Sequence, residues 1–401
     1  MVLKIRSLVL WPMAVSLMCV ALVVGCSSNS ASTSAGSTTQ NSKGAVKIFV
    51  TSSFTGATFS DPEALSGAEA AASTINAAGG INGHPIVIIS CDDQLTPSLA
   101  TQCAQKAVKD GVTAVTGVLL FGQQTFSVLT PAEIPVIDAE PIAPIETSAA
   151  NSFPINAGAF PTFTGAAEKV VESGARNVAI IQGNNAINQT GTPYIVQGVK
   201  AAGGNVVRIV TATAGSPSYA PYVSAALAGG KVQGLLWVGT FADTAKLVLA
   251  ARQGGFNGPI GMSGSDITSS IVKSLGSAAN NLYLASPYFI PPSKVAAPYV
   301  ASMKKYAPGA SIDVVSQEVF AAVQTAAVAL RDSSSFTASA LTKALSSQTA
   351  LTAGPYAPVV NMTQPGPIAG SPRLFTTDVE FYKIENGAFT SIGGFFNPYA
   401  K

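Results

Sequence analysis

The sequence predicts an α/β protein with two doubly wound parallel-sheet lobes and a ligand cleft between them. Short apolar runs alternate with helix-like segments from Ala45 onward, and the same alternation starts again after Pro161. Short strands that are apolar along their whole length, each followed by a helix, indicate a parallel sheet with helices on both faces. The chain of 401 residues is also long enough for two separate cores.

In the first half of the chain, the helix signals are clear at both ends of one segment. Asp61 and Pro62 are typical of a helix start, and the pair Gly79 and Gly80 is typical of a helix end. We expect strands at 47–50, 85–89, 114–118 and 134–137, and helices at 61–77, 97–109 and 123–130.

The second half repeats this pattern and ends in a hairpin. We expect strands at 177–181, 205–210, 234–238, 259–262 and 282–286, and helices at 162–173, 193–202, 219–228, 240–253, 268–275, 296–306, 315–331 and 337–345. The alternating stretch 378–384, followed by Asn386 and Gly387, indicates a late hairpin. Ligands bind beyond the carboxyl ends of parallel strands, so two facing lobes would share one cleft there.

Composition excludes several classes of function. The net charge of +2 is too small to hold a phosphate backbone, which argues against a nucleic-acid partner. His84 is the only histidine, so His-rich metal sites are excluded. Ser263 lies in a run resembling a nucleophile elbow, but the second glycine is one place early and His84 is its only possible histidine partner. We therefore expect no enzyme, no metal site and no cofactor.

The first residues predict export and a lipid anchor. Lys4 and Arg6 precede an uncharged apolar run that ends in Gly25 and Cys26. This pattern is typical of a lipoprotein signal peptide at 1–25, with Cys26 as the lipidated first residue of the mature chain. The polar stretch 26–44 reads as a flexible tether. The alternative is an uncleaved signal anchor. Either reading places the protein outside the cytoplasm, and the lipoprotein reading attaches it to the outer face of the cell membrane.

Two cysteines remain once Cys19 and Cys26 are set aside. Cys91 follows an apolar strand-like run, and Cys103 lies on the helix predicted after it. A helix that returns over its preceding strand could bring the two within bonding range, in a compartment that permits disulfides. We expect a Cys91–Cys103 disulfide, the alternative being two reduced, buried cysteines.

Three stretches carry a family resemblance. Residues 75–83 (INAAGGING), 91–94 (CDDQ) and 198–204 (GVKAAGG) resemble the branched-chain amino acid type of ABC-transporter substrate-binding protein, a type I periplasmic binding fold. The order of elements from about 45 to 392 is similar too. The resemblance implies capture of a small-molecule ligand by lobe closure and its delivery to permease and ATPase subunits. It also implies chain crossings near 158–161, 286–292 and Gly354, giving one lobe of 45–158 with 289–353 and another of 159–288 with 354–392.

The ligand-binding residues of that family transfer poorly to this chain. Members that bind amino acids hold the carboxylate with a Ser or Thr hydroxyl and backbone N–H groups after the third and fourth strands. Here Ile142 stands where threonine is usual, Pro141 has no N–H, and Glu140 would repel a carboxylate. Ile187 falls at a usual tyrosine, and the acid that pairs with the ammonium aligns near Gly264, with Asp266 two residues away.

We therefore expect a neutral or cationic solute with an apolar portion rather than a free α-amino acid. Each phenylalanine in the predicted site could instead belong to a core, and Glu140 could instead form a salt bridge on the hinge side. The expected ligand-binding residues are Phe59, Phe121, Gly122, Gln123, Gln124, Glu140, Ile142, Ile187, Thr240, Phe241 and Asp266.

A second class of function fits the same fold. A ligand-binding sensor or regulatory protein would have the same lobes and cleft. Genes for a permease and an ATPase beside this gene would favour transport, whereas a kinase or antiterminator gene would favour sensing.

Overall fold

The computed structural model describes residues 44–56, 60–291 and 293–400. The predicted signal peptide, Cys26 and all of the predicted tether except Gly44 lie outside the described residues. Within the described ranges, no helix combines the length and the apolar character needed to cross a bilayer.

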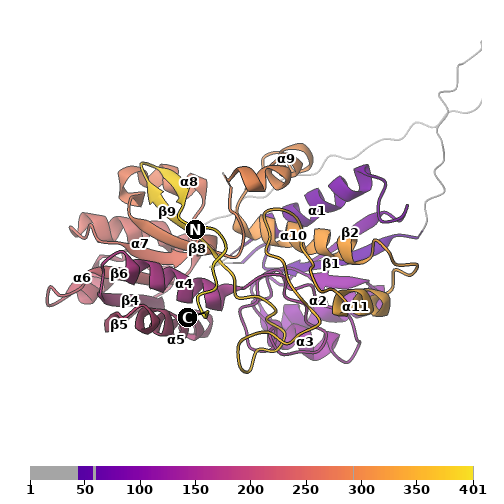
Figure 1. Ribbon diagram of the computed structural model, residues 1–401, viewed down its shortest axis with the longest axis horizontal. Coiled ribbons are helices and arrows are strands. Elements are labelled where there is room, and N and C mark those ends of the chain that lie inside the picture. The colour runs from indigo at the N-terminus through magenta and orange to yellow at the C-terminus, as the bar shows by residue number, and fades with distance from the viewer. Residues whose placement is uncertain (1–43, 57–59, 292, 401) are drawn as a thin grey trace, which may run out of the picture. The chain divides into compact units, whose positions relative to one another are not determined.

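The first lobe is built on a three-stranded parallel sheet with the order β2-β1-β3. Alternate side chains of β1 point to opposite faces of the sheet. Val46, Ile48 and Val50 pack towards helices α1 and α10, and Phe49 packs towards α2 and α3. Because both faces of the sheet carry apolar side chains, helices cover both faces (Figure 1). The bounds are β1 Val46–Ser52, β2 Ile86–Asp92, β3 Ala114–Thr116, α1 Pro62–Ala77, α2 Pro97–Asp110 and α3 Gly122–Leu129.

Three later helices return to this first lobe. They are α9 (Ala297–Tyr306), α10 (Val314–Ala329) and α11 (Ala338–Ser346); α9 and α10 pack on α1, and α11 packs on α10 (Figure 1). Helix α1 approaches α10 closely because Gly67 has no side chain: a Cβ there would lie 2.1 Å from the carbonyl oxygen of Ser316. The first core therefore depends on residues more than two hundred positions apart.

The second lobe is built on a seven-stranded sheet with the order β10-β9-β8-β7-β6-β4-β5. Strands β4 to β8 are parallel, and β9 and β10 form an antiparallel hairpin at the edge. The bounds are β4 Asn177–Gly183, β5 Asn205–Ala212, β6 Gly234–Val238, β7 Ile260–Ser263, β8 Leu282–Ser286, β9 Glu380–Glu385 and β10 Ala388–Ser391.

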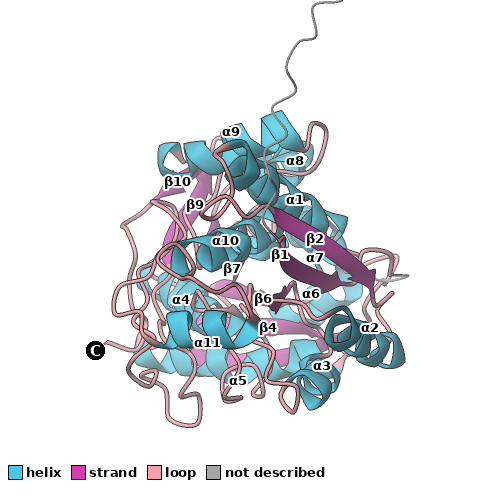
Figure 2. Cartoon of the chain, turned by 90° about the vertical axis from the view of Figure 1, so that its right-hand side faces the viewer, coloured by secondary structure: helices cyan, strands magenta, loops and turns pink. Residues whose placement is uncertain are grey.

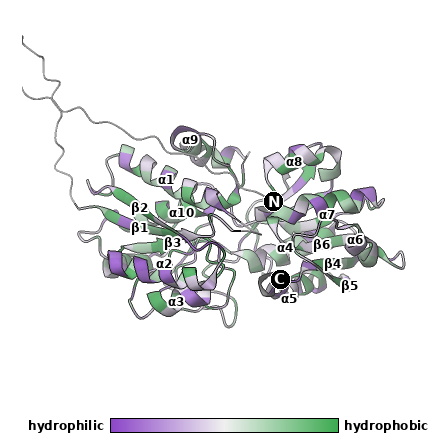
Figure 3. Cartoon of the chain, turned by 180° about the vertical axis from the view of Figure 1, so that it is seen from behind, coloured by the Kyte–Doolittle hydropathy of each residue, from purple (hydrophilic) through white to green (hydrophobic). Residues whose placement is uncertain are grey.

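Helices cover both faces of the second sheet as well (Figure 2). Val178 and Ile180 of β4 pack towards α4 (Ala159–Glu172) and α5 (Ala186–Ala201). Ala179 and Ile181 pack towards the other side, which carries α6 (Ala220–Leu227), α7 (Phe241–Gln253) and α8 (Ser269–Leu275). The hydrophobic colour is concentrated on such central strands, for example β6, in Figure 3. The predicted fold class is confirmed.

Two predicted elements differ in the structure. The stretch predicted as a strand at 134–137 makes only isolated parallel bridges through Val136, to Val115 and to Ser152. Pro135 has no N–H to donate, so a longer ladder cannot form there. Helix α5 begins at Ala186, well before the predicted start at Pro193, because Asn185 caps it by accepting a hydrogen bond from the N–H of Asn188.

The last crossing between the lobes also lies later than predicted. Tyr356, Val360 and Met362 belong to the core of the first lobe, and Phe375 packs against that core. The chain enters the second lobe only at Val379, whereas the resemblance placed this crossing near Gly354. The intervening segment contributes apolar side chains to the first core, so its packing determines where the crossing occurs.

Cys91 and Cys103 are joined by a disulfide in the structure. Cys91 lies on β2 and Cys103 is buried on α2, with a Cα–Cα distance of 5.6 Å. The bond closes a short loop with a sequence separation of 12. It fixes the helix onto the edge strand of the first sheet.

We expect the double variant Cys91→Ala/Cys103→Ala to lose about 3 kcal/mol of unfolding free energy, because its unfolded chain is no longer restricted by the loop. Chemical denaturation followed by circular dichroism measures the loss. Wild-type protein in reducing agent is the control and should move in the same direction. Equal stability of oxidised and reduced wild type would contradict a stabilising bridge.

Candidate ligand-binding site

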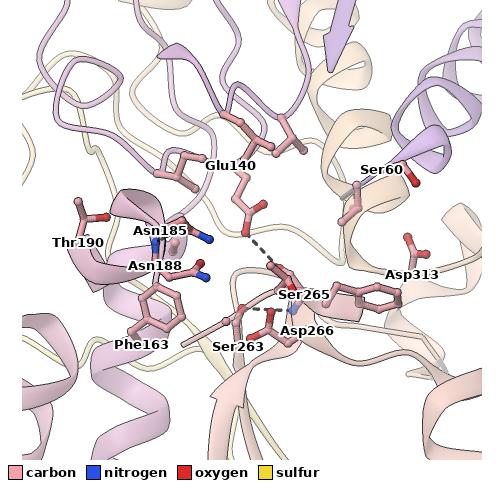
Figure 4. Close-up of a pocket in the computed structure, with 18 of the residues that line it drawn as sticks. Ser60, Glu140, Phe163, Asn185, Asn188, Thr190, Ser263, Ser265, Asp266 and Asp313 are labelled. Carbon is pink, nitrogen blue, oxygen red and sulfur yellow. Dashed lines mark hydrogen bonds between the residues drawn. The ribbon is translucent and has the colours of Figure 1, made fainter. Parts of the chain in front are cut away.

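A cavity of about 200 Å³ lies where the carboxyl ends of strands from both lobes meet (Figure 4). The loops after β3, β4, β6 and β7 all contribute to it, as expected for facing parallel sheets. The first lobe lines it with Ser60, Glu63, Leu95, Val118, Leu120, Glu140, Ile142, Asp313 and Val315. The second lobe lines it with Ala159, Phe160, Phe163, Asn185, Asn188, Thr190, Gly239, Thr240, Phe241, Ser263, Ser265, Asp266 and Thr268.

Glu140 reaches across the cavity from the first lobe to the second. Its Oε1 accepts a hydrogen bond from the hydroxyl of Ser265 at 3.2 Å, drawn as a dashed line in Figure 4. The loop that carries Glu140 is fixed by a buried hydrogen bond, which the side chain of Asn156 donates to the carbonyl oxygen of Ala139. The two lobes are thus linked through a side chain that faces the cavity.

The lining is acidic as well as apolar. Glu63, Glu140, Asp266 and Asp313 all face the cavity, and among the described residues that line it there is no Lys, Arg or His. The four ion pairs in the described part of the chain lie elsewhere. A ligand that carries positive charge would therefore find partners, and a ligand that carries only negative charge would not.

Burial holds protons on three of these carboxyl groups near neutral pH. Burial raises the pKa of Glu140 to about 7. Burial and then the charge of Glu140 raise the pKa of Asp266 to about 8. Burial and then the charge of Asp313 raise the pKa of Glu63 to about 7. A bound cation would favour the charged forms and release these protons.

A second group of carboxyl groups lies deeper in the first lobe. Asp138, Glu146 and Glu318 are fully buried. Burial is the main cause that holds the pKa of each group well above its usual range, and the charges of nearby carboxylates add to it. Both oxygens of Asp138 and of Glu318 have no hydrogen-bond partner. These groups are therefore neutral at physiological pH or contribute a strongly negative potential behind Glu140.

The backbone donors after Pro141 are already occupied. The Oε2 of Glu146 accepts hydrogen bonds from the N–H of Ile142 at 2.6 Å and of Ala143 at 2.9 Å. Gly122 makes room for this carboxylate, since a Cβ there would lie 2.1 Å from its Oε1. The loop therefore offers neither of these two N–H groups to a ligand.

The wall from the second lobe combines aromatic rings with amide groups. Phe160 stacks on Tyr194 with ring centroids 4.3 Å apart, and Phe163 and Phe241 add further apolar surface. Asn185 and Asn188 lie at the start of α5, and the side-chain nitrogen of Asn188 has no hydrogen-bond partner. This wall could contact an apolar part of a ligand, and the side-chain nitrogen of Asn188 could donate a hydrogen bond to one polar group of that ligand.

The cavity contains five of the residues predicted from the sequence: Glu140, Ile142, Thr240, Phe241 and Asp266. That these five contact a ligand remains a prediction. The predicted residues Phe121, Gly122, Gln123 and Gln124 lie at the start of α3 and do not line the cavity, because this turn packs against Glu146 instead. Phe59 lies outside the described residues, as does the side chain of Ile187.

Sequence reasoning missed several residues that line the cavity. Glu63 and Asp313 come from two helices that meet only in the folded lobe, and Asn185 and Asn188 belong to the unpredicted first turn of α5. The Asn-x-x-Asn spacing of the α5 cap was the available signal for that turn. No local signal links Glu63 with Asp313.

No group of three or more His, Cys, Asp or Glu suited to a metal ion occurs in the part of the chain that the structure describes. His84 lies in a turn, with its Nδ1 2.7 Å from the carbonyl oxygen of Gly44 and its ring 4.1 Å from that of Phe336.

Two parallel-sheet lobes around a small cavity define a two-lobed binding protein of the type I periplasmic fold. The sequence profile of the family described as Periplasmic binding protein matches residues 45–378, so the chain belongs to this family. It is a family of substrate-binding proteins and not of enzymes. The predicted resemblance is confirmed at the level of family.

Relatives and solved structures agree with this membership. The chain is 26% identical over 253 residues to the Leu/Ile/Val-binding protein of Escherichia coli, covering 60% of this chain and 67% of that protein. The substrate-binding protein of a branched-chain amino acid transporter from Streptococcus pneumoniae, solved with isoleucine, superposes with a TM-score of 0.73 at 18% identity, covering 88% of this chain and 100% of that one. A fatty acid ABC transporter substrate-binding protein from Thermomonospora curvata gives 0.75 at 14%, covering 88% and 92%. At these identities the structures show the shared fold alone.

The buried carboxyl groups predict how stability changes with pH. Glu63, Glu140 and Asp266 bind protons in the folded state that the unfolded chain releases between about pH 4 and pH 8, so the free energy of unfolding falls as pH rises through this window. Asp138, Glu146 and Glu318 act in the same direction. The melting temperature of the ligand-free protein should be higher at about pH 5.5 than at about pH 8.

Glu140→Gln should raise the melting temperature at about pH 8 and change it little at about pH 5.5, because only the charged form of Glu140 is destabilised by burial. Glu69→Gln, an exposed carboxyl group on α1, is the matched control and should change neither value. A large loss of stability in Glu140→Gln at both pH values would mark Glu140 as structural.

Proposed function

We propose that the protein is the extracytoplasmic solute-binding receptor of an ABC importer. The observation that carries the proposal is the cavity enclosed by both lobes and bridged by Glu140 and Ser265. Its relatives include proteins named for binding Leu, Ile and Val, and the solved structures include ABC transporter substrate-binding proteins. In this proposal, closure of the lobes buries the ligand, and the permease recognises the closed form.

We propose further that the ligand is a neutral or cationic solute with an apolar portion, and not a plain α-amino acid. A free amino acid carries a carboxylate that needs donors or a cation. Here Glu146 occupies the N–H groups of Ile142 and Ala143, and Glu140 faces the same space. The apolar portion would lie against Phe163 and Phe241.

The protein's attachment to the membrane is also part of the proposal. A lipid on Cys26 would hold the receptor at the outer face of the cell membrane, and the polar stretch up to Gly44 would let the lobes reach the permease. The supporting observation is the sequence of an apolar run, Gly25 and Cys26.

A thermal-shift screen of the full chain in detergent tests the ligand class. The panel holds amino acids, amides, amines, aromatic acids, sugars and nucleosides. A ligand at 100 times its Kd adds about 2.7 kcal/mol of stability, which a raised melting temperature reveals. We expect a shift with a neutral or cationic solute and none with leucine, isoleucine or valine.

A shift with leucine, isoleucine or valine would contradict the proposed ligand class and leave the receptor role intact. No shift with any solute from a folded sample would contradict the receptor role itself. The ligand that is found should bind Glu140→Gln about tenfold more weakly, the loss typical of a hydrogen bond to a charged group, and should bind Glu69→Gln normally.

Cys26→Ser should abolish lipid attachment, because the variant has no thiol at position 26 to be alkylated. Phase partitioning in a cloud-point detergent and incorporation of a labelled fatty acid measure this change. Cys19→Ser is the control, because that residue would leave with the signal peptide. Membrane retention of the wild type without incorporated label would instead support a signal anchor.

A further inference from the structure

The acidic residues of the cavity fall into two pairs of different origin. Glu140 comes from the first lobe and Asp266 from the second, and they flank Ser265 in Figure 4. Glu63 and Asp313 both come from the first lobe, and Figure 4 draws Asp313 on the far side of Ser265 from Phe163, beside Ser60. Only the first pair is divided between the lobes.

The second pair is a consequence of how α1 meets α10. Gly67 lets the two helices approach until its Cα faces the carbonyl of Ser316, in the first turn of α10. Glu63 lies one turn before Gly67 on α1, and Asp313 caps α10 by accepting from the N–H of Ser316 at 3.0 Å. Both carboxyl groups line the cavity, near enough for the charge of Asp313 to act on Glu63, without a basic residue among the described residues that line it.

Apolar side chains make up much of the remaining wall. Val118, Leu120 and Ile142 line the first lobe, and the cavity volume of about 200 Å³ admits only a small solute. Asp313 accepts hydrogen bonds from Ser311 and Ser316, but neither acidic pair has a cationic partner, so a solute with a single positive charge would neutralise only one pair. A short apolar chain with a positive charge at each end would provide a partner for both.

We propose that the solute is an organic dication of the diamine class, with one ammonium group between Glu140 and Asp266 and the other at Glu63 and Asp313. This inference rests on the receptor function proposed above and specifies its ligand. The site is the interlobe cavity of the binding fold, and the acidic pairs set its selectivity. Glu63 and Asp313 lie on first-lobe segments, and the start of α10 also contacts the turn that carries Asp266.

The raised pKa values are consistent with this placement. The charge of Asp313 contributes to the raised pKa of Glu63, and the charge of Glu140 contributes to that of Asp266, in each case after burial. Two ammonium groups would relieve both repulsions. Binding should therefore release protons and weaken as pH falls from about 8 to about 5.5.

Isothermal titration calorimetry on the full chain in detergent at about pH 8 tests the inference. The ligands are 1,4-diaminobutane and 1,5-diaminopentane, with butylamine and pentylamine as monoamines of matched length. We expect at least one diamine to bind about tenfold or more tightly than its matched monoamine. Glu63→Gln should reduce the diamine to the affinity of the monoamine, and Glu69→Gln, an exposed acid on the same helix, should bind both as the wild type does.

Asp266→Asn, from the other lobe, gives a second measurement and should weaken diamine and monoamine alike. Equal affinity of the wild type for diamine and monoamine would overturn the inference, and so would Ca²⁺ or Mg²⁺ binding in place of amines. Binding of another solute without any amine binding would overturn the inference and leave the receptor function standing. A folded protein that binds no solute in either experiment would overturn both.

Discussion

The geometry of the cavity depends on one buried amide, that of Asn156. Its nitrogen donates to the carbonyl of Ala139 and, at 3.1 Å, to the hydroxyl of Tyr288, and its oxygen accepts from the N–H of Gly158 at 2.7 Å. These partners belong to the loop that carries Glu140 and to two of the segments that connect the lobes. A single side chain therefore fixes the acidic loop relative to the connections about which the lobes would move.

The second constraint is the burial of carboxyl groups without bases. An ionised carboxylate that loses water and gains no partner is strongly unfavourable, so Asp138 and Glu318 must keep protons or have their charge offset. Either outcome disfavours an anionic ligand at Glu140. If Asp138 and Glu318 are protonated, they supply no positive charge to the ligand, and if they are ionised, they repel it. In the proposed receptor, selectivity against anions would therefore arise from the interior of the first lobe as well as from the shape of the cavity.

Periodicity in the sequence was enough to predict the two sheets, because central strands such as β1, β4 and β6 are buried on both faces and are apolar along most of their length. Strand-end loops likewise indicated Glu140 and Asp266. The rest depended on contacts between distant segments: Glu63 meets Asp313 only through the packing of α1 on α10, and the late crossing near Val379 depends on side chains such as Tyr356 joining the first core. The turn of Phe121 lies outside the cavity lining, and Gly122 there packs on a buried acid that no local pattern reveals.

That buried acid, Glu146, has a consequence for how this chain differs from amino-acid-binding members of its family. Its carboxyl group accepts from the N–H groups of Ile142 and Ala143, in the loop where the family resemblance implies donors to a ligand carboxylate. An incoming carboxylate would have to displace a side chain that is fully buried and lies against Gly122. A cation meets no such obstacle, because the ionisable groups among the described residues that line the cavity are all carboxyl groups. The carboxyl group of Glu146 thus occupies these donors, which supports the proposal that the ligand is not an anion.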